Sequence, residues 1–240
     1  MDGGGYISSN WDKSSNNIII RMQIKLLLND ENARMLYEIS EKIGGKINTN
    51  KNKGYIVWYA TNKSDLLKVF SVFTRYPLLT VKSQYQLQFA KNCLLEKYKD
   101  INSFLVARNN KYNEIILLYK YNSENTIRLP LYFSPWLSGF IEAKGKYSSK
   151  QYYFSESSLS KCYCLCLDNN ESHISDLIIL YFNTSASDII FNIPKKDITI
   201  NIVSPKSRDI LYKHLENYPL LGVKINSSWT RDYSNVSPLY

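Results

Sequence analysis

Apolar and polar residues alternate along two segments near the start of the chain, and this spacing predicts β-strands at residues 6–11 and 17–28. In the second segment, apolar residues occupy the even positions from Ile20 to Leu26. The odd positions between them are Arg21, Gln23 and Lys25. Since successive side chains of a strand point to opposite faces, these polar side chains are expected to share one face of a sheet.

The spacing then changes to a helical period and back again. Residues 30–43 predict a helix that Asn29 or Asp30 caps and that Gly44-Gly45 ends. The expected elements that follow are strands at 46–48 and 55–60 with a turn at 50–54, a helix from about Ser64 that breaks before Pro77, and a helix at 82–99.

The second half of the chain repeats this order of elements. Its expected elements are strands at 146–154 and 160–167, a helix at 171–182, strands at 187–192 and 196–203, and a helix at 206–216. The segment Tyr76–Lys82 recurs as Tyr218–Lys224 at an offset of 142 residues, with six of seven residues identical. We interpret the chain as two diverged copies of one unit of roughly 100 residues.

A helix with small residues is expected ahead of the second copy, starting at Ser134-Pro135. Ser138, Gly139 and Ala143 lie on neighbouring faces of that helix, which permits close approach of a partner helix. Close packing would offset the cost of a helical glycine, about 1 kcal/mol relative to alanine. The alternative is a surface helix with an incidental glycine.

The segment Leu137–Gly145, read as Leu-Ser-Gly-Phe-Ile-Glu-Ala-Lys-Gly, resembles the motif of the LAGLIDADG homing endonucleases and intron maturases. Asp2–Ile7 is similar to the tail of a first such motif, 140 residues earlier. The resemblance is greatest to the two-motif, single-chain members that fungal mitochondrial introns encode.

This resemblance implies an α+β fold of two pseudo-symmetric α-β-β-α-β-β-α units, whose antiparallel sheets form saddles along the major groove of DNA. The expected domains are residues 1–100, with a truncated motif helix, a bridge at 101–133, and residues 134–240. Without a first motif helix, the second would expose an apolar stripe and offer a surface for a protein partner. The stripe consists of Trp136, Leu137, Phe140 and Ile141.

In the family, the last acidic residue before the motif glycine binds a divalent metal ion, and two such sites make a staggered double-strand break. The corresponding residues are Gly4 and Lys144. Glycine has no side-chain oxygen and an ammonium repels Mg²⁺, so both metal-binding acids are expected to be lost. Asp2 and Glu142 are neighbouring acids, two residues earlier and about 200° around a helix. A shifted alignment would make Asp2 a ligand.

The chain of 240 residues carries 30 Lys+Arg against 21 Asp+Glu, a net charge of +9. Residues 1–120 hold 18 basic and 10 acidic residues, whereas residues 121–240 hold 12 and 11. This asymmetry favours a polyanion as the partner of the first half, although a merely basic soluble protein would show it too. The expected nucleic-acid contacts are Ser8, Asn10, Arg21, Gln23, Lys25, Lys46, Asn48, Lys51, Lys53, Lys150, Lys195 and Lys196.

The remaining composition excludes several classes of protein. No run of about 18 apolar residues suggests a membrane span. Cys162, Cys164 and Cys166 alternate within one strand and match neither a disulfide framework nor a zinc site, so no metal site is expected from them. His173 and His214 are expected to be ordinary surface or helix residues. Abundant Ile, Asn, Lys, Tyr and Phe, which A/T-rich codons specify, indicate an organelle or an A/T-rich genome. The resemblance to proteins of mitochondrial introns implies a mitochondrial, organelle-encoded protein.

The sequence is therefore interpreted as a nucleic-acid-binding protein on a degenerate LAGLIDADG scaffold. We expect a cleavage-deficient intron-RNA maturase or a component of an organellar ribonucleoprotein, with RNA favoured over DNA and no cofactor. The alternative is an active intron-encoded DNA endonuclease that uses Mg²⁺. A third reading is an interaction protein whose cysteine-rich second sheet contacts another protein.

Overall fold

The computed structural model divides the chain into two units, Met1–Thr126 and Ile127–Tyr240, which we describe separately. It describes residues 1–95, 97–111, 128–153, 159–168, 171–182, 189–192, 197–202 and 204–226, with the backbone alone at several strand positions of the second unit. Within these ranges, no helix has the length and apolar character needed to cross a membrane.

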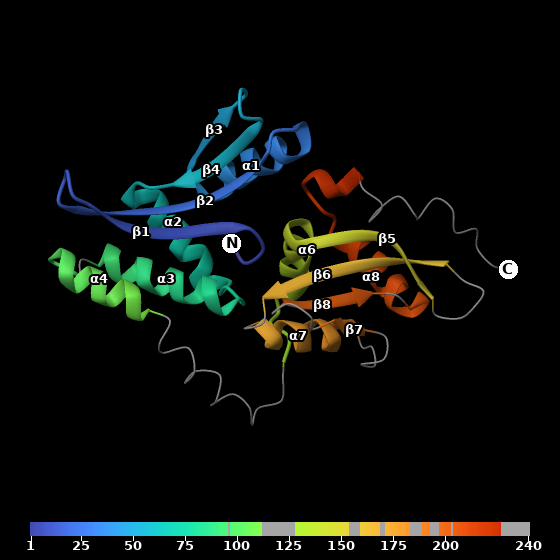
Figure 1. Ribbon diagram of the computed structural model, residues 1–240. Coiled ribbons are helices and arrows are strands. Elements are labelled where there is room, and N and C mark those ends of the chain that lie inside the picture. Colours follow the sequence, from blue (N-terminus) through green and yellow to red (C-terminus); the bar gives the residue numbers. More distant parts are fainter. Residues whose placement is uncertain are drawn as a thin grey trace. The chain divides into compact units, whose positions relative to one another are not determined.

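The first unit is a four-stranded antiparallel sheet with helices (Figure 1). Its elements are β1 (Gly5–Asp12), β2 (Asn17–Leu27), α1 (Asp30–Ile43), β3 (Lys46–Asn50), β4 (Tyr55–Ala60), α2 (Lys63–Arg75), α3 (Val81–Leu94) and α4 (Ile101–Asn110). The strands are ordered β1-β2-β4-β3. The predicted strands and the first two predicted helices are confirmed.

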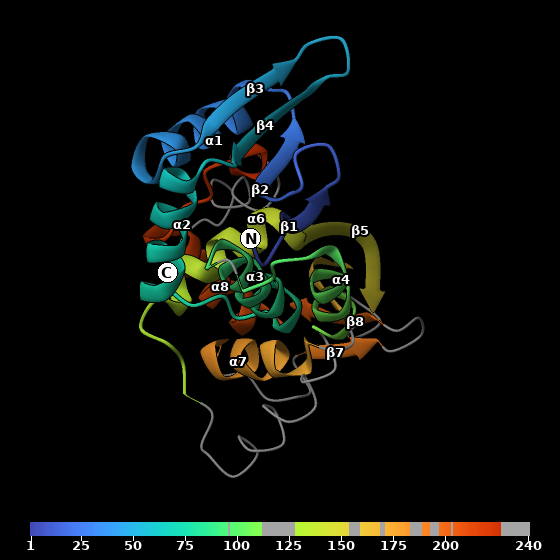
Figure 2. The same ribbon diagram turned by 90° about the vertical axis from the view of Figure 1, so that its left-hand side faces the viewer.

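The helices α1 and α2 cover one face of this sheet, as both views show (Figures 1 and 2). Leu36 of α1 and Leu66 and Val69 of α2 pack with Ile56 and Trp58 of β4, and each of these side chains is at most 2% exposed. Burying one such side chain contributes about 1.5–3 kcal/mol to folding. The opposite face of the sheet, which we call the outer face, is left without a covering helix of this unit.

The predicted helix at 82–99 is too long. The structure ends α3 at Leu94 and starts α4 at Ile101. Asp100 caps α4 by accepting a hydrogen bond of 2.9 Å from the backbone N–H of Ser103. No glycine or proline marks the break in the sequence, so the turn between the two helices had no local signal.

The helix α4 belongs to the core of the first unit, although it lies in the segment predicted as a bridge. Phe104 is fully buried, with its ring 5.9 Å from that of Trp11 and 5.5 Å from that of Phe89. The apolar run at 115–118 falls outside the described residues. The domain boundaries stay a prediction.

Two glycines fix the connection from α1 into β3. Gly44 and Gly45 have φ of +81° and +93°, a region that residues with a side chain rarely adopt. The indole Nε1 of Trp58 donates a hydrogen bond of 2.8 Å to the carbonyl of Gly44. A Cβ on Gly45 would stand 2.5 Å from that nitrogen, so only glycine fits where β3 begins.

The second unit repeats the topology of the first. Its elements are α6 (Phe133–Lys144), β5 (Gly145–Tyr153), β6 (Leu159–Asp168), α7 (Ser172–Phe182), β7 (Ile189–Asn192), β8 (Asp197–Ile202), α8 (Pro205–Asn217) and the 3₁₀ helix η3 (Val223–Asn226). The sheet order β5-β6-β8-β7 matches β1-β2-β4-β3 strand by strand. The predicted α+β class and the internal repeat are thereby confirmed.

The motif helix α6 does not expose the predicted apolar stripe, so that expectation was wrong. Leu137, Phe140 and Ile141 are at most 3% exposed, and α6 contacts β5 and β6. Trp136 is half-buried and stacks on Phe140 with ring centroids 4.8 Å apart. The sequence could not show that these side chains contribute to a core rather than to a partner surface.

A buried histidine joins α6, α7 and α8. His214 is 3% exposed; its Nε2 lies 2.9 Å from Ser138 Oγ and its Nδ1 lies 2.7 Å from the hydroxyl of Tyr181. Ser138 donates to the carbonyl of Tyr218 at 2.6 Å, so Nε2–H must donate to Ser138 and Tyr181 must donate to Nδ1. Burial lowers the pKa of His214 to about 4. His214 is a helix residue of α8, one of the two places that the sequence allowed, and it is buried rather than on the surface.

We predict that His214 makes the stability of the protein pH-dependent. Its folded pKa of about 4 lies below the ordinary value of 6.5, so the unfolded chain binds the proton first as the pH falls. The stabilisation is complete above pH 6.5 and is lost by about 1.4 kcal/mol per pH unit down to pH 4. Denaturant unfolding of wild type, His214→Gln and the control His173→Gln measures this slope. An unchanged slope in His214→Gln would contradict the prediction.

The Gly44-Gly45 turn gives a second prediction, with Gly54 as a matched control. Gly54 also has a positive φ, +63°, but a Cβ there meets nothing within 4 Å. Gly54→Ala should therefore lower the free energy of unfolding by only about 1–2 kcal/mol, the cost of the left-handed backbone. Gly45→Ala adds the collision with Trp58 and should cost roughly 1–3 kcal/mol more. Equal losses in urea unfolding would exclude the proposed role of the collision.

Candidate nucleic-acid interface

The outer face of the first sheet collects the polar residues that the alternation predicted. Gln23 of β2 stands opposite Tyr6 of β1 and Tyr59 of β4, and Tyr59 stands opposite Lys46 of β3. The predicted contact residues that the register places on this face are Ser8, Asn10, Arg21, Gln23, Lys25, Lys46 and Asn48. One surface therefore combines cations, amides and hydroxyls.

Two of the cations lie over tyrosine rings of β4. The guanidinium of Arg21 is 5.8 Å from the ring centroid of Tyr59, and the ammonium of Lys25 is 4.0 Å from that of Tyr55. Such cation–π contacts contribute about 0.5–1 kcal/mol at exposed sites, enough to favour one side-chain position. Among the residues that the structure describes, no carboxylate pairs with Arg21 or Lys25. The two charges are thus oriented and available to an anion.

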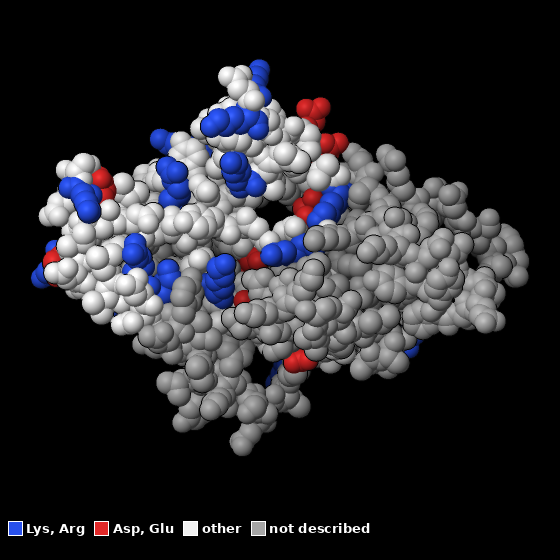
Figure 3. Space-filling view, viewed as in Figure 1, with Lys and Arg blue, Asp and Glu red and all other residues white. Residues whose placement is uncertain are grey.

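Lys51 and Lys53 extend the basic surface at the tip of the β3–β4 hairpin. Both are exposed, and the turn is fixed by a hydrogen bond of 2.9 Å from the N–H of Lys53 to Asn50 Oδ1. Basic side chains lie across the surface of the first unit in the space-filling view (Figure 3). The hairpin tip places its charges at the end of the outer face, where a long polyanion would meet them.

Sequence reasoning missed the apolar and aromatic members of the outer face. They are Tyr6, Ile19, Leu27, Tyr55, Val57 and Tyr59. The signal existed, because Tyr55, Val57 and Tyr59 alternate with the buried Ile56, Trp58 and Ala60. Because the residues on both faces of β4 are apolar or aromatic, the sequence pattern did not show which face is exposed.

The predicted nucleic-acid contacts of the second unit lie outside the part of the chain that the structure describes. The side chain of Lys150 and both Lys195 and Lys196 lie outside the described residues, as do the side chains of Cys162, Cys164 and Cys166. The alternate positions Tyr163, Leu165 and Leu167 of β6 are buried. The predicted contacts of the second sheet, with protein or with nucleic acid, stay predictions.

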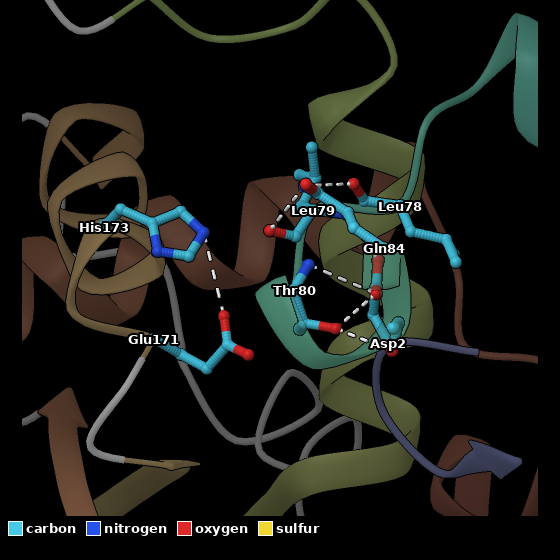
Figure 4. A network of polar contacts seen from close by, with 8 residues as sticks. Asp2, Leu78, Leu79, Thr80, Gln84, Glu171 and His173 are labelled. Carbon is cyan, nitrogen blue, oxygen red and sulfur yellow. Dashed lines mark hydrogen bonds and ion pairs between the residues drawn. The ribbon is translucent and has the colours of Figure 1, made fainter. Parts of the chain in front are cut away.

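Asp2, the neighbouring acid of the first motif, is bound to the loop that follows α2 (Figure 4). Its carboxylate accepts hydrogen bonds of 2.8 Å from the N–H of Leu79, 3.2 Å from the N–H of Thr80 and 2.6 Å from the hydroxyl of Thr80. Leu79 and Thr80 directly follow Tyr76-Pro77-Leu78, the start of the repeated segment. A motif acid and the repeat therefore meet in one contact.

Glu142, the neighbouring acid of the second motif, makes the same kind of contact. Its two carboxylate oxygens accept hydrogen bonds from the N–H groups of Gly222, at 3.2 Å, and Lys224, at 3.3 Å. The ammonium of Lys224 donates in return to the carbonyls of Ile141, at 2.9 Å, and of Glu142. A cation at the C-terminal carbonyls of a helix is favourable. The contact therefore stabilises the end of α6 through Lys224 and the loop through Glu142.

The two contacts occupy equivalent places in the two units, and we call each a carboxylate clasp. Gly5 and Gly145 are each the first residue of a strand, three residues after Asp2 and Glu142. The C-cap residues of α2 and α8, Tyr76 and Tyr218, have nearly the same backbone angles, φ −128° and ψ 79° against φ −132° and ψ 74°. The proline after each tyrosine disfavours a further helical turn.

The residues before the two strand-opening glycines do not fit Mg²⁺. Gly4 contributes no side-chain oxygen, and Lys144 contributes an ammonium. Asp2 and Glu142 direct their oxygens to backbone N–H groups. In the part of the chain that the structure describes, no three His, Cys, Asp or Glu residues gather as a metal site would require.

Two other side chains of reactive types, Cys93 and His173, have an ordinary structural explanation. Cys93 lies in the core of the first unit, and burial raises the pKa of its thiol to about 11, which leaves it unreactive at neutral pH. His173 lies 3.7 Å from the carboxylate of Glu171 at the start of α7 (Figure 4), an ordinary pairing at a helix N-terminus. Within the described ranges, neither group belongs to a cluster of three or more His, Cys, Asp or Glu residues.

Comparison with known proteins identifies relatives of this chain. The family model described as LAGLIDADG endonuclease matches residues 1–93. The probable intron-encoded endonuclease aI3 of Dictyostelium discoideum is 33% identical over 234 residues, which cover 95% of this chain and 90% of that protein. The corresponding protein of Dictyostelium citrinum is 31% identical, covering 96% and 90%.

Solved structures show the same fold at low sequence identity. The LAGLIDADG meganuclease I-AabMI, bound to uncleaved DNA, has a TM-score of 0.72 at 19% identity, covering 93% of this chain and 83% of the meganuclease. I-CpaMI, also bound to uncleaved DNA, has a TM-score of 0.70 at 18% identity, covering 98% and 86%. Together with the motif residues, these relationships establish that the chain belongs to the LAGLIDADG endonuclease family.

Proposed function

We propose that this protein binds duplex DNA through the outer face of its first sheet and does not cleave it. The observation that carries the proposal is the set of cations on this face, of which Arg21 and Lys25 are held over tyrosine rings without a carboxylate partner among the described residues. Neutralising phosphates releases counterions from the nucleic acid and drives binding. Amides and hydroxyls between the cations supply contacts to base edges.

Duplex DNA replaces the RNA that the sequence favoured, for two reasons. The major groove of B-form DNA admits side chains from a sheet, whereas that of A-form RNA is too deep and narrow. Single-stranded RNA would need free ring faces for stacking, but Lys25 and Arg21 lie over the rings of Tyr55 and Tyr59. The meganucleases I-AabMI and I-CpaMI, which share the fold, bind DNA.

The absence of cleavage rests on the ends of the two motifs. Family members place a metal-binding acid before the glycine that opens the strand, and Gly4 and Lys144 stand at those positions here. The adjacent acids Asp2 and Glu142 are engaged in the carboxylate clasps, so using them as ligands would leave backbone N–H groups without acceptors. Each such loss costs about 1–3 kcal/mol.

A second candidate is an active DNA endonuclease, which the names of the relatives favour, since both are called probable intron-encoded endonucleases. The same names support an origin in an intron, and with the A/T-rich codon preference they support a mitochondrial location. A protein that has lost cleavage but is encoded in an intron could instead assist splicing of that intron as a maturase. Competition between intron RNA and intron-insertion-site DNA separates these roles.

The proposal predicts a salt-dependent affinity that the hairpin lysines share. If Lys51 and Lys53 each contact a phosphate, the double variant Lys51→Ala/Lys53→Ala should lower the slope of log K against log salt by roughly two. The control Lys42→Ala/Lys63→Ala removes two exposed lysines from the helices that cover the opposite face, and should leave the slope unchanged. Fluorescence anisotropy with a duplex of the insertion site measures both. Equal slopes in the two variants would contradict the proposal.

The proposal also predicts that the duplex stays intact in millimolar Mg²⁺. Supercoiled plasmid carrying the insertion site should show no linear product beyond the level seen with EDTA. A linear product that EDTA abolishes would contradict the proposal and support the endonuclease candidate.

Glu142→Ala separates a structural from a catalytic acid. Loss of the acceptor for two N–H groups should lower the free energy of unfolding by about 1–3 kcal/mol. Glu216→Ala, at an exposed position of α8, is the control and should change it by less than about 0.5 kcal/mol. Unfolding curves in urea give both values. A stability equal to that of wild type in Glu142→Ala would show that the clasp is not structural.

A further inference from the structure

Two apolar side chains of the outer face stand directly opposite amide side chains. Ile19 of β2 is paired with Asn10 of β1, and Val57 of β4 is paired with Asn48 of β3. Ile19 is 47% exposed, Val57 is half-buried, and both asparagines are exposed. Directly opposite residues have Cβ atoms about 4.5–5.5 Å apart, so each pair forms one small surface that is half amide and half hydrocarbon.

The amides of these pairs are available to a ligand. Neither Asn10 nor Asn48 hydrogen-bonds through its side chain to any other residue that the structure describes. This distinguishes them from Asn50 on the same face, whose Oδ1 accepts a hydrogen bond from the N–H of Lys53 and holds the turn. An amide with a free donor and a free acceptor can make two hydrogen bonds at once to a flat partner.

The chemistry of these pairs corresponds to an A·T base pair seen from the major groove. Adenine presents the N7 acceptor beside the N6 donor, which an asparagine amide satisfies with two hydrogen bonds. Thymine presents a methyl group, which an aliphatic side chain contacts. A G·C pair offers neither an acceptor–donor edge on the purine nor a methyl group.

We infer that the Asn10/Ile19 and Asn48/Val57 pairs recognise A·T base pairs, so that the preferred ligand is a duplex with two A·T-rich clusters. The inference rests on the proposed function and names the sequence class that the outer face selects. The separation of the two pairs can be measured along β2. Ile19 itself lies on β2, and the β2 residue opposite Val57 is Lys25, six residues further along. Six residues span roughly 20 Å along a strand, which corresponds to a separation of about six base pairs.

Selection from a pool of duplexes with a randomised centre tests the inference. The bound fraction should be enriched in A·T at two clusters about six base pairs apart. Asn48→Ala should lower the enrichment at one cluster about tenfold and leave the other unchanged, and Asn10→Ala should do the converse. Lys53→Ala, a phosphate contact, should weaken binding of all sequences alike and leave the enrichment intact.

The thymine methyl groups can be tested singly by replacing thymine with uracil, which lacks only the methyl. Wild type should lose about three- to tenfold in affinity when the thymines of one cluster are replaced. Val57→Thr, which keeps the β-branched shape but exchanges a methyl for a hydroxyl, should show less than half of that loss. Lys42→Ala, on a helix that covers the opposite face of the sheet, is the control and should respond to uracil as wild type does.

The outcomes separate this inference from the proposed function. Salt-dependent binding with no A·T enrichment, or with an equal uracil effect in wild type and Val57→Thr, would overturn the inference and leave DNA binding in place. No salt-dependent binding to any duplex would overturn both. Two spaced A·T clusters, each lost with its own asparagine, would support the inference.

Discussion

The structure depends on the carboxylate clasp that each unit forms between its motif and the repeated segment, which follows α2 in the first unit and α8 in the second. In the first unit Asp2 accepts hydrogen bonds from the N–H groups of Leu79 and Thr80, and in the second Glu142 accepts from those of Gly222 and Lys224. A proline one turn earlier stops each helix and leaves these N–H groups without a helical partner. The acid and the repeated segment are therefore retained together, because each satisfies the polar groups of the other.

The clasp separates structure from chemistry at the motif ends. The acid of each clasp holds a loop by hydrogen bonds, whereas the residue two positions later is Gly4 or Lys144, which in our proposal concerns the metal alone. The outer face is similarly independent of the core, since its side chains alternate with the buried ones along β2 and β4. In our proposal, a DNA-binding surface thus persists without the metal-binding acids.

The sequence predicted the elements and the repeat well, because alternation, caps and prolines are local signals. It placed Arg21, Gln23 and Lys25 on one face for the same reason. It could not show that Leu137 and Phe140 are buried, because an apolar stripe reads alike in a core and on a partner surface. Nor could it show the clasps, since Asp2 and Thr80 are 78 residues apart and meet only in the folded unit.

The most direct test of the account is a crystal structure of the protein with an insertion-site duplex and Mn²⁺, located by its anomalous scattering. The account predicts two intact strands along the outer face of the first sheet. It also predicts no Mn²⁺ beside Gly4 or Lys144, with Asp2 and Glu142 still bound to their N–H groups. Mn²⁺ held by Asp2 or Glu142 at a broken phosphodiester would contradict it.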